Sequence, residues 1–446
     1  MTSTALLTDR YELTMVQAAL ADGTAHRRSV FEVFTRSLPA GRRYGVLAGT
    51  GRVLDALASF RFGDAELAWL EAERVVDDRT LAWLADYRFG GTIVGYAEGE
   101  TYVPGSPLMV VEGTFAEAVL LETLVLSILN FDSAIAAAAS RMTSAAVDRP
   151  CLEMGARRAH EEAAVAAARA AVVAGFAGTS NLEAGRRYGL PTIGTAAHAY
   201  TLLHDDEEEA FRSQVASMGT GTTLLVDTYD VRRGVQRAVA AGGTGLGAVR
   251  LDSGDLGVLA IEVRRQLDGL GARDTQIVVT SDLDEHAIAS LAVAPVDSYG
   301  VGTRLVTGSG APTCGMVYKL VARADDDGTM QPVAKASTSK TSVGGRKSAA
   351  RRYGPDGRAS AEVVAGGPDD EVAAWSPDDD LRPLHVPLVV DGAIDHRWTG
   401  ATGVRLAAER HRASRDELPR GARRLSAGEP TIPTERTTVA RLAGRP

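Results

Sequence analysis

The stretch VVAGFAGTSNLEAGRRYGLPTIGTAAHAY, residues 172–200, decides which fold the sequence predicts. Its apolar run Val172–Phe176 has the length of a strand, and Leu182–Tyr188 has the composition of a short helix. A second strand is expected at Thr192–Gly194, shortly before His198. Loops that follow two parallel strands leave the same edge of a sheet, which is where ligands bind in parallel α/β proteins. The stretch therefore predicts a ligand site that includes this histidine.

Residues with known capping preferences delimit the predicted helix. Asn181 is a good N-cap, because its side-chain oxygen can accept a backbone N–H of the first turn. Gly189 suits the C-terminal end, and Pro191 opens the next strand. The loop before the helix, Gly178–Asn181, consists of small and polar residues and can cradle an anion.

From Cys151 onward, the chain alternates short apolar runs with helical stretches. Seven such runs end in polar or glycine-rich loops: LEMGARR, AGFAGTS, PTIGTAAH, LLVDTYD, AVRLDSGD, IVVTSDLD and SYGVGTRL, which begin at Leu152, Ala174, Pro191, Leu224, Ala248, Ile277 and Ser298. Strands that alternate with helices are typical of parallel βα units. Seven in succession favour a closed or nearly closed α/β barrel, with an open doubly wound sheet as the alternative.

Both ends of the chain have an α+β character. The first part contains a half-buried strand at Ser29–Arg36, and the alternating, basic region after the barrel is expected to return and complete this first domain. The predicted division is an N-terminal domain over residues 1–115, a barrel over 116–318, a returning segment over 319–426 and a disordered tail over 427–446.

The composition is that of a soluble globular enzyme. The chain has 446 residues, 24% of them charged and 45% hydrophobic, which suggests two or three domains. A net charge of −9 argues against a nucleic-acid partner. No run is expected to approach the roughly 18 apolar residues of a membrane span. The stretch MTSTALLTDRYELTM lacks the basic region and apolar core of an export signal, so we expect a cytoplasmic protein. Cys151 and Cys314 fit neither a metal pattern nor a disulfide.

His198 is the strongest catalytic candidate. It follows small residues at the end of a predicted strand, so its ring should be accessible. An imidazole with a pKa near 6.5 can act as a neutral nucleophile and accept a phosphoryl group. A structural role is the alternative for any single histidine.

Two acidic motifs follow predicted strands. In LDSGDLG, Asp252 stands at a strand end, with Ser253 and Gly254 in the turn, and LVDTYD places Asp227 in the same way. A carboxylate there can hold a sugar hydroxyl or Mg²⁺. A cluster of helix N-caps is the alternative reading.

Three further candidates are less specific. The loop that contains Gly302 and Thr303 could bind a phosphate through its backbone N–H groups. Arg157 and Arg158 offer planar guanidinium groups to a carboxylate or phosphate, but paired arginines on a helix face water more often than not. Tyr11 is either a stacking platform or an ordinary core aromatic.

Taken together, these motifs resemble those of the nicotinate phosphoribosyltransferases. The resemblance runs from about Leu6 to about Arg352 and rests on LLTDRYELTM, FEVFTRSLPAGRRYGVLAG, GARRA, GTSNLEAGRRYGLPTIGTAAH, LVDTYD, VRLDSGDLG, YGVGTRLVTG and VYKLVAR in this order. It implies an irregular seven-stranded α/β barrel of the type II phosphoribosyltransferases beside a sandwich domain built from both ends of the chain. It also implies a homodimer with shared active sites.

The resemblance further implies a reaction and residue roles. Nicotinate and phosphoribosyl pyrophosphate (PRPP) would give nicotinate mononucleotide and pyrophosphate, coupled to ATP hydrolysis with Mg²⁺. By similarity, His198 is the phosphorylated residue, Tyr11 stacks on the pyridine ring from the second subunit, and Arg157 meets nicotinate. The residues implied around PRPP are Asp227, Arg250, Asp252, Ser253, Gly254, Gly302 and Thr303.

One position bears on the choice of substrate. Relatives that use nicotinamide carry an aspartate in the loop where this chain has Ser180, which has no charge to repel the carboxylate of nicotinate. The chain departs from the commoner family pattern at Thr35, Ala197 and Ala199. A nicotinamide or quinolinate phosphoribosyltransferase, or a non-catalytic nucleotide-binding barrel, are the competing hypotheses.

Overall fold

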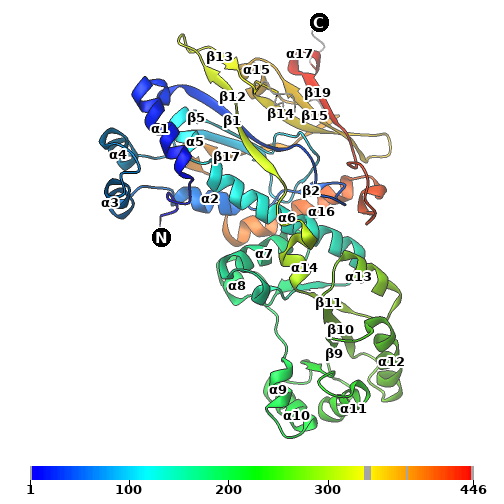
Figure 1. The fold of residues 1–446 in the computed structure, drawn as a ribbon. Helices are drawn as coiled ribbons and strands as arrows, with labels where there is room; N and C mark the ends of the chain where they lie inside the picture. The colour runs from blue at the N-terminus through cyan, green and yellow to red at the C-terminus, as the bar shows by residue number, and fades with distance from the viewer. Residues whose placement is uncertain (1–2, 336–342, 378–379, 443–446) are drawn as a thin grey trace. The chain divides into compact units, whose positions relative to one another are not determined.

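The chain folds into two compact units (Figure 1). The structure is a computed structural model that describes residues 3–335, 343–377 and 380–442. Unit 1 consists of Met1–Ala137 with Ala311–Pro446, and unit 2 is Ala138–Gly310. Both boundaries lie inside the range 116–318 that the sequence assigned to the barrel. The first falls within helix α6 (Glu122–Ala146), which begins in unit 1 and ends in unit 2.

A six-stranded parallel sheet forms the centre of unit 2. Its strand order is β7-β6-β11-β10-β9-β8, and every neighbouring pair is parallel. The strands are β6 (Cys151–Glu153), β7 (Gly178–Thr179), β8 (Thr223–Leu225), β9 (Ala248–Leu251), β10 (Gln276–Ser281) and β11 (Ser298–Val301). The prediction of a parallel α/β domain is therefore confirmed.

The third of the seven predicted strands contributes only one bridge. Thr192 pairs with Thr179 in parallel, and Pro191 beside it has no N–H to donate to a longer ladder. Among the described residues, no pairing joins this segment to β8, so the ladder is open between them. Unit 2 is thus a mixed α/β structure whose sheet has six strands and one additional bridge.

The stretch of residues 172–200 folds partly as predicted. Helix α8 (Leu182–Tyr188) has Asn181 as its N-cap, whose side chain accepts the Ala184 N–H at 2.9 Å, and Gly189 ends it with φ 64°. The strand prediction over Val172–Phe176 is wrong. Val172 and Val173 are the last two residues of the alanine-rich helix α7, and Val173 belongs to its buried face.

The other helices of unit 2 lie between the sheet strands in sequence or after the last of them. They are α7 (Glu161–Val173), α9 (His198–Leu202), α10 (Glu207–Met218), α11 (Val231–Gly242), α12 (Leu256–Gly269), α13 (Glu285–Ser290) and α14 (Thr303–Val306). Both α9 and α10 lie between β7 and β8. Several begin with an acidic cap; for example, the side chain of Asp230 accepts the Arg233 N–H at 2.9 Å.

Unit 1 contains a seven-stranded sheet of order β13-β12-β1-β5-β3-β17-β18 and a four-stranded sheet of order β16-β14-β15-β19. Its strands are β1 (Arg28–Thr35), β2 (Gly45–Val46), β3 (Thr92–Tyr96), β4 (Thr101–Tyr102), β5 (Met109–Thr114), β12 (Met316–Ala324), β13 (Met330–Pro332), β14 (Lys347–Tyr353), β15 (Ala359–Gly366), β16 (Leu381–Pro383), β17 (His385–Val390), β18 (Ala393–Ile394) and β19 (Thr434–Thr438). The antiparallel pairing of β1 with β12 joins the two ends of the chain in one sheet.

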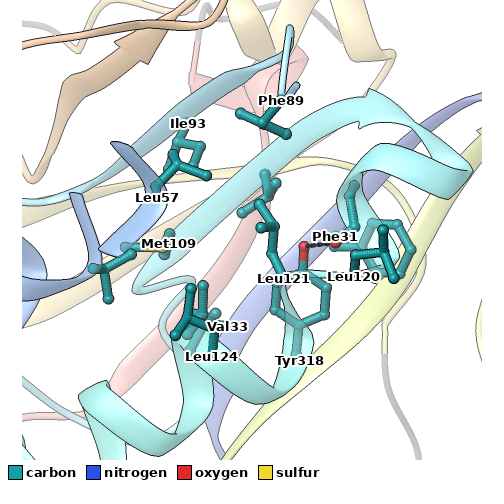
Figure 2. Packing of buried hydrophobic residues seen from close by; sticks show 14 of the residues in the cluster. Phe31, Val33, Leu57, Phe89, Ile93, Met109, Leu120, Leu121, Leu124 and Tyr318 are labelled. Atoms are coloured by element: carbon teal, nitrogen blue, oxygen red, sulfur yellow. Dashed lines mark hydrogen bonds between the residues drawn. The ribbon is translucent and has the colours of Figure 1, made fainter. Parts of the chain in front are cut away.

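The core of unit 1 packs around this larger sheet. Phe31 of β1 stacks on Tyr318 of β12 with ring centroids 4.9 Å apart, and Leu121 and Leu124 lie near them (Figure 2). The Tyr318 hydroxyl donates to the Ala118 carbonyl at 2.8 Å. The helices of this unit are α1 (Arg10–Asp22), α2 (Thr50–Ala58), α3 (Asp64–Ala72), α4 (Asp78–Ala85), α5 (Phe115–Val119), α15 (Asp369–Ala373), α16 (Gly400–Glu417) and α17 (Val439–Leu442).

One helical stretch is apolar enough to cross a membrane by length and composition. It is Phe115–Ala146, where α5 runs into α6, and 67% of its most apolar window is buried inside the protein. The expectation that no run approaches such a length is thus corrected. Leu120, Leu121 and Leu129 of this stretch belong to the core of unit 1, and this burial accounts for the apolar composition.

The C-terminal tail is also ordered further than predicted. Thr434–Thr438 forms β19, which pairs in parallel with β15, so the prediction of a disordered tail is wrong for this segment. The predicted tail also includes residues 443–446, which lie outside the described residues.

Candidate active site

A cavity of about 530 Å³ opens at the carboxyl ends of the unit 2 strands. Loops that follow β6, β7, β9, β10 and β11 supply its lining. The candidates that line it are Arg157, Ser180, Arg250, Asp252, Gly302 and Thr303. Since parallel strands place their following loops at one edge, residues distant in sequence meet here.

The remaining unit 2 candidates lie beside this lining. The Asp227 carboxylate accepts the Asp252 N–H and the Ser253 hydroxyl, both at 2.8 Å, and so joins the ends of β8 and β9. Gly254 follows with φ 85°, which favours glycine in this turn. Tyr11 belongs to unit 1, on helix α1, and is exposed.

His198 is the first residue of α9, and its ring faces acidic side chains. Its Nε2 lies 3.9 Å from Asp227 Oδ1 and 3.9 Å from Asp252 Oδ2. Its Nδ1 lies 3.1 Å from the hydroxyl oxygen of Thr228. The imidazole is 40% exposed, so it can meet both these groups and a ligand.

Asp227 is almost fully buried but incompletely satisfied. Its side chain is 2% exposed, and its Oδ1 has no hydrogen-bond partner in the part of the chain that the structure describes. A buried carboxylate oxygen without a donor costs free energy. The atom is therefore suited to accept a hydrogen bond from a ligand hydroxyl, or to hold a cation.

Arg250 brings a positive charge into the same wall. Burial lowers the pKa of its guanidinium, the carboxylates of Asp252 and Asp227 oppose that shift, and Arg157 adds to it. The group donates to the Thr195 hydroxyl, but its Nε has no acceptor among the described residues. The cavity thus holds a cation whose hydrogen-bonding capacity is not filled by the protein.

Close packing shapes the floor of the cavity. A Cβ on Gly300 would come within 2.7 Å of Met154 Sδ, so only glycine fits there. A Cβ on Gly302 would meet nothing nearer than 3.5 Å, so packing does not demand this glycine. Its place before α14, on the cavity wall, leaves the backbone open to a ligand.

Several residues of the site were not predicted. Thr195, Ser281 and Asp282 line the cavity, and the Thr280 hydroxyl donates to the Asp252 carboxylate. All of them follow or end predicted strands, so their position in the apolar runs was the available signal. Thr228 next to Asp227 was missed in the same way.

No group of three or more His, Cys, Asp or Glu side chains that could hold a metal occurs in residues 3–335, 343–377 and 380–442. Asp227 and Asp252 nevertheless offer two carboxylates at one edge of the cavity. Mg²⁺ is often held by one or two carboxylates together with substrate phosphates and water. The donor set therefore fits a magnesium ion that arrives with a phosphorylated substrate.

Comparison with known proteins gives a consistent picture. Residues 6–130 match the model of the nicotinate phosphoribosyltransferase (NAPRTase) N-terminal domain. The chain is 57% identical over 439 residues to nicotinate phosphoribosyltransferase pncB1 of Mycobacterium tuberculosis, with 96% of this chain and 94% of that protein covered. It is 38% identical to the Bacillus subtilis nicotinate phosphoribosyltransferase, with 77% and 72% covered.

Solved structures share the fold. The human nicotinic acid phosphoribosyltransferase has a TM-score of 0.81 at 24% identity, with 98% of this chain and 99% of that chain covered. The nicotinate-nucleotide pyrophosphorylase of Pyrococcus furiosus has a TM-score of 0.73 at 25% identity, with 92% and 96% covered. Because the sequence identity to curated relatives extends over nearly the whole length, the chain belongs to the nicotinate phosphoribosyltransferase family, and it is an enzyme of NAD biosynthesis that acts on nicotinate and PRPP.

Proposed function

We propose that the cavity of unit 2 is where nicotinate and PRPP react, and that His198 couples ATP hydrolysis to this reaction. One observation carries the proposal: the His198 ring lies 3.9 Å from both Asp227 and Asp252, and Asp252 lines the cavity together with Arg157 and Arg250. The nucleophilic imidazole and the residues that bind the sugar and its phosphates would then lie at the same cavity opening.

Nicotinate would be held by Arg157 and Ser180. A guanidinium can bind a carboxylate through two parallel hydrogen bonds. Arg157 lies on the short 3-10 helix Ala156–Arg158, which contributes to the cavity wall. Ser180 on the opposite loop adds no negative charge that would repel the carboxylate. This pair favours nicotinate over nicotinamide. Quinolinate, with two carboxylates, would need further cations.

PRPP would occupy the acidic and glycine-rich loops. Asp227, Asp252, Ser253 and Gly254 would surround the ribose and pyrophosphate together with Arg250, and the sixth strand end, Gly302 with Thr303, would take the 5′-phosphate. Departure of pyrophosphate from the ribose leaves an oxocarbenium-like centre, which the pyridine nitrogen attacks. The chain then contributes positioning and neutralisation of the leaving group more than a strong base.

ATP coupling would pass through a phosphohistidine. A lone pair on a His198 ring nitrogen attacks the γ-phosphorus of ATP, the bond to ADP breaks, and a phosphorus–nitrogen bond forms. Water later cleaves that bond, which releases phosphate and restores the imidazole. The accessible ring beside the cavity supports this role.

Asp227 and Asp252 would hold Mg²⁺ when it binds with PRPP, and the ion would neutralise phosphate charge. The buried Oδ1 atom of Asp227 without a protein donor supports this assignment.

At the level of architecture, we propose that the six strands and the Thr192 bridge represent the irregular seven-stranded barrel of the type II phosphoribosyltransferases, with unit 1 as its sandwich domain. We also propose a cytoplasmic homodimer in which Tyr11 of one subunit stacks on the nicotinate bound by the other. Its exposed ring supports this role.

The test is product formation from PRPP with nicotinate, nicotinamide or quinolinate, with and without ATP. His198→Ala should abolish ATP stimulation and leave some ATP-independent nicotinate mononucleotide synthesis. His204→Ala is the matched control, since this nearby ring contacts the Tyr200 carbonyl at 2.9 Å and should leave coupling intact. Undiminished ATP stimulation in His198→Ala would refute the role of this histidine.

A further inference from the structure

Glu153 is a fully buried carboxylate that precedes Met154, a residue of the cavity lining. It is the last residue of β6, it is 0% exposed, and the loop that follows it carries Arg157. β6 lies between β7 and β11, so Glu153 pairs with Thr179 on one side and with Val301 on the other. Neither the family motifs quoted above nor the proposed reaction assigns it a role.

The carboxylate joins two loops that come from different strands. Glu153 Oε1 accepts the backbone N–H of Gly155, at the start of the arginine loop. Glu153 Oε2 accepts the hydroxyl of Thr179, which in turn accepts the Asn181 N–H at 2.9 Å. The Glu153 carbonyl also accepts the Ser180 N–H at 2.8 Å. One residue therefore fixes the backbone on both sides of the proposed nicotinate subsite.

The arginine loop is also packed tightly in this position. A Cβ on Gly155 would come within 2.9 Å of the Gly302 carbonyl oxygen. The loop can thus approach the Gly302 turn only because residue 155 is glycine. A shift of the Glu153 carboxylate would move a backbone segment that has little free space around it.

The cost of burying this charge indicates a specific purpose. Among the described residues, no lysine or arginine forms an ion pair with Glu153, so only hydrogen bonds compensate its burial. Burial raises the pKa of the carboxyl, while the Thr179 hydroxyl and the Gly155 N–H oppose the shift. An apolar residue would fill the same space without a desolvation cost. The carboxylate is therefore best explained by the two donors that it aligns.

We propose that Glu153 is a positioning residue that holds the Arg157 loop and the Ser180 loop in one register and thereby sets the preference for a pyridine carboxylate over the corresponding amide. The inference rests on the proposed function, in which Arg157 and Ser180 contact nicotinate. Glu153 itself touches no substrate. It acts through the distance and orientation between the guanidinium and the serine loop, and small displacements of such groups reduce binding strongly.

The experiment is a double-mutant cycle with steady-state kinetics. Glu153→Leu removes both acceptors and is expected to raise the KM for nicotinate about tenfold or more, while the KM for PRPP stays within about threefold. The ratio of kcat/KM for nicotinate to that for nicotinamide should fall about tenfold. In the Arg157→Ala background, the same change should have little further effect, because the two residues act as one unit.

Two further variants test whether the effect comes from the hydrogen bonds of Glu153, from its charge or from a loss of folding. Glu153→Gln can still accept from Gly155 and can donate to Thr179 Oγ1, so it should keep nicotinate kinetics close to those of the unchanged chain. If Glu153→Leu does not fold, Thr179→Val removes one of the two links with nearly the same shape and should reproduce part of the effect. Glu285→Gln is the control, a buried carboxylate of unit 2 that pairs with Arg141 at 2.8 Å and is absent from the cavity lining.

A folded Glu153→Leu or Thr179→Val chain with unchanged nicotinate KM and unchanged acid preference would overturn the inference. Fully additive effects of Glu153→Leu and Arg157→Ala would overturn it as well. If instead Arg157→Ala leaves the nicotinate KM unchanged, the proposed nicotinate subsite itself fails and the inference falls with it. The single Arg157 variant therefore distinguishes the two failures.

Discussion

Both units bury charged side chains, but they satisfy them differently. In unit 1, Arg351 is 0% exposed and donates to Glu362 at 2.6 Å, to Glu100 at 3.1 Å and to the Thr101 carbonyl at 2.7 Å. Arg382 also binds Glu100, at 3.0 Å, so the carboxylates of unit 1 are closely matched by guanidinium groups. Arg351 Nε lacks a partner among the described residues, but the other two nitrogens of that guanidinium bind carboxylates; the guanidinium of Arg250, at the cavity of unit 2, bonds only to the Thr195 hydroxyl in the part of the chain that the structure describes.

The difference indicates what each set of charges is for. Breaking a buried ion pair is strongly destabilising, so the unit 1 network contributes to the stability of the fold. At the cavity of unit 2, Asp227 Oδ1 lacks a partner and Arg250 binds no carboxylate among the residues that the structure describes. Functional sites commonly carry such unsatisfied groups at some cost in stability, because a ligand completes them.

The largest expected effect is the loss of the unit 1 network. Arg351→Met leaves Glu100 and Glu362 buried without their shared cation, so the free energy of unfolding should fall by about 3–5 kcal/mol. Urea unfolding followed by circular dichroism measures the change. Arg405→Gln, which breaks an exposed pair with Glu409, should cost less than about 1 kcal/mol. Equal losses of unfolding free energy in the two variants would show that the buried network stabilises the fold no more than an exposed ion pair does.

The corresponding change in unit 2 should act on catalysis. Asp252→Asn keeps the shape of a side chain that accepts the Thr280 hydroxyl and faces His198, but it removes the charge. We expect kcat for nicotinate mononucleotide formation to fall about 10²-fold, with the free energy of unfolding unchanged to within about 1 kcal/mol. Asp268→Asn on the surface of α12 is the control and should leave kcat unchanged. Full activity of Asp252→Asn would remove this carboxylate from the mechanism.

A smaller effect should appear in the pH dependence of stability. His411 of unit 1 is 2% exposed, and burial, with help from Arg415 and Arg412, lowers its pKa to about 3. Because the unfolded chain binds a proton near pH 6.5 and the folded chain does not, stability is lost as the pH falls below that value. Between about pH 7.5 and about pH 5.5, this loss should reach about 1 kcal/mol.

Comparison with His411→Gln isolates that contribution. Burial raises the pKa of Glu32 and of Glu362, which titrate in the opposite sense in both chains. The difference between the two pH slopes in urea unfolding therefore reports the histidine alone. Identical slopes would contradict its neutral, buried state.

The sequence predicted the order of elements better than their lengths. The N-cap at Asn181 and the end of α8 at Gly189 are local chemistry, and both are confirmed. The extent of β7 and the single bridge at Thr192 depend on which neighbours donate hydrogen bonds, and a single sequence does not specify these. The apolar pair Val172 and Val173 fitted a strand as well as the end of helix α7.

The residues of the site were likewise predicted where their position in the chain decides their place in the fold. Residues directly after strands, such as Asp252 and Arg157, were predicted, since parallel topology brings them to one edge. Glu153 was missed because it lies inside an apolar run, although an acidic residue at that place is itself a signal. Thr280 and Thr228 gained meaning only from their contacts with Asp252 and His198.

The most direct test of the contrast between the two units is a pair of measurements on Arg250→Gln: its free energy of unfolding in urea and its PRPP dissociation constant by calorimetry. We predict that PRPP binding weakens about 30-fold or more, while stability is unchanged or higher, because an incompletely paired buried cation is removed. A large loss of stability with unchanged PRPP affinity would mean that Arg250 serves the fold, as Arg351 does, and would contradict the account.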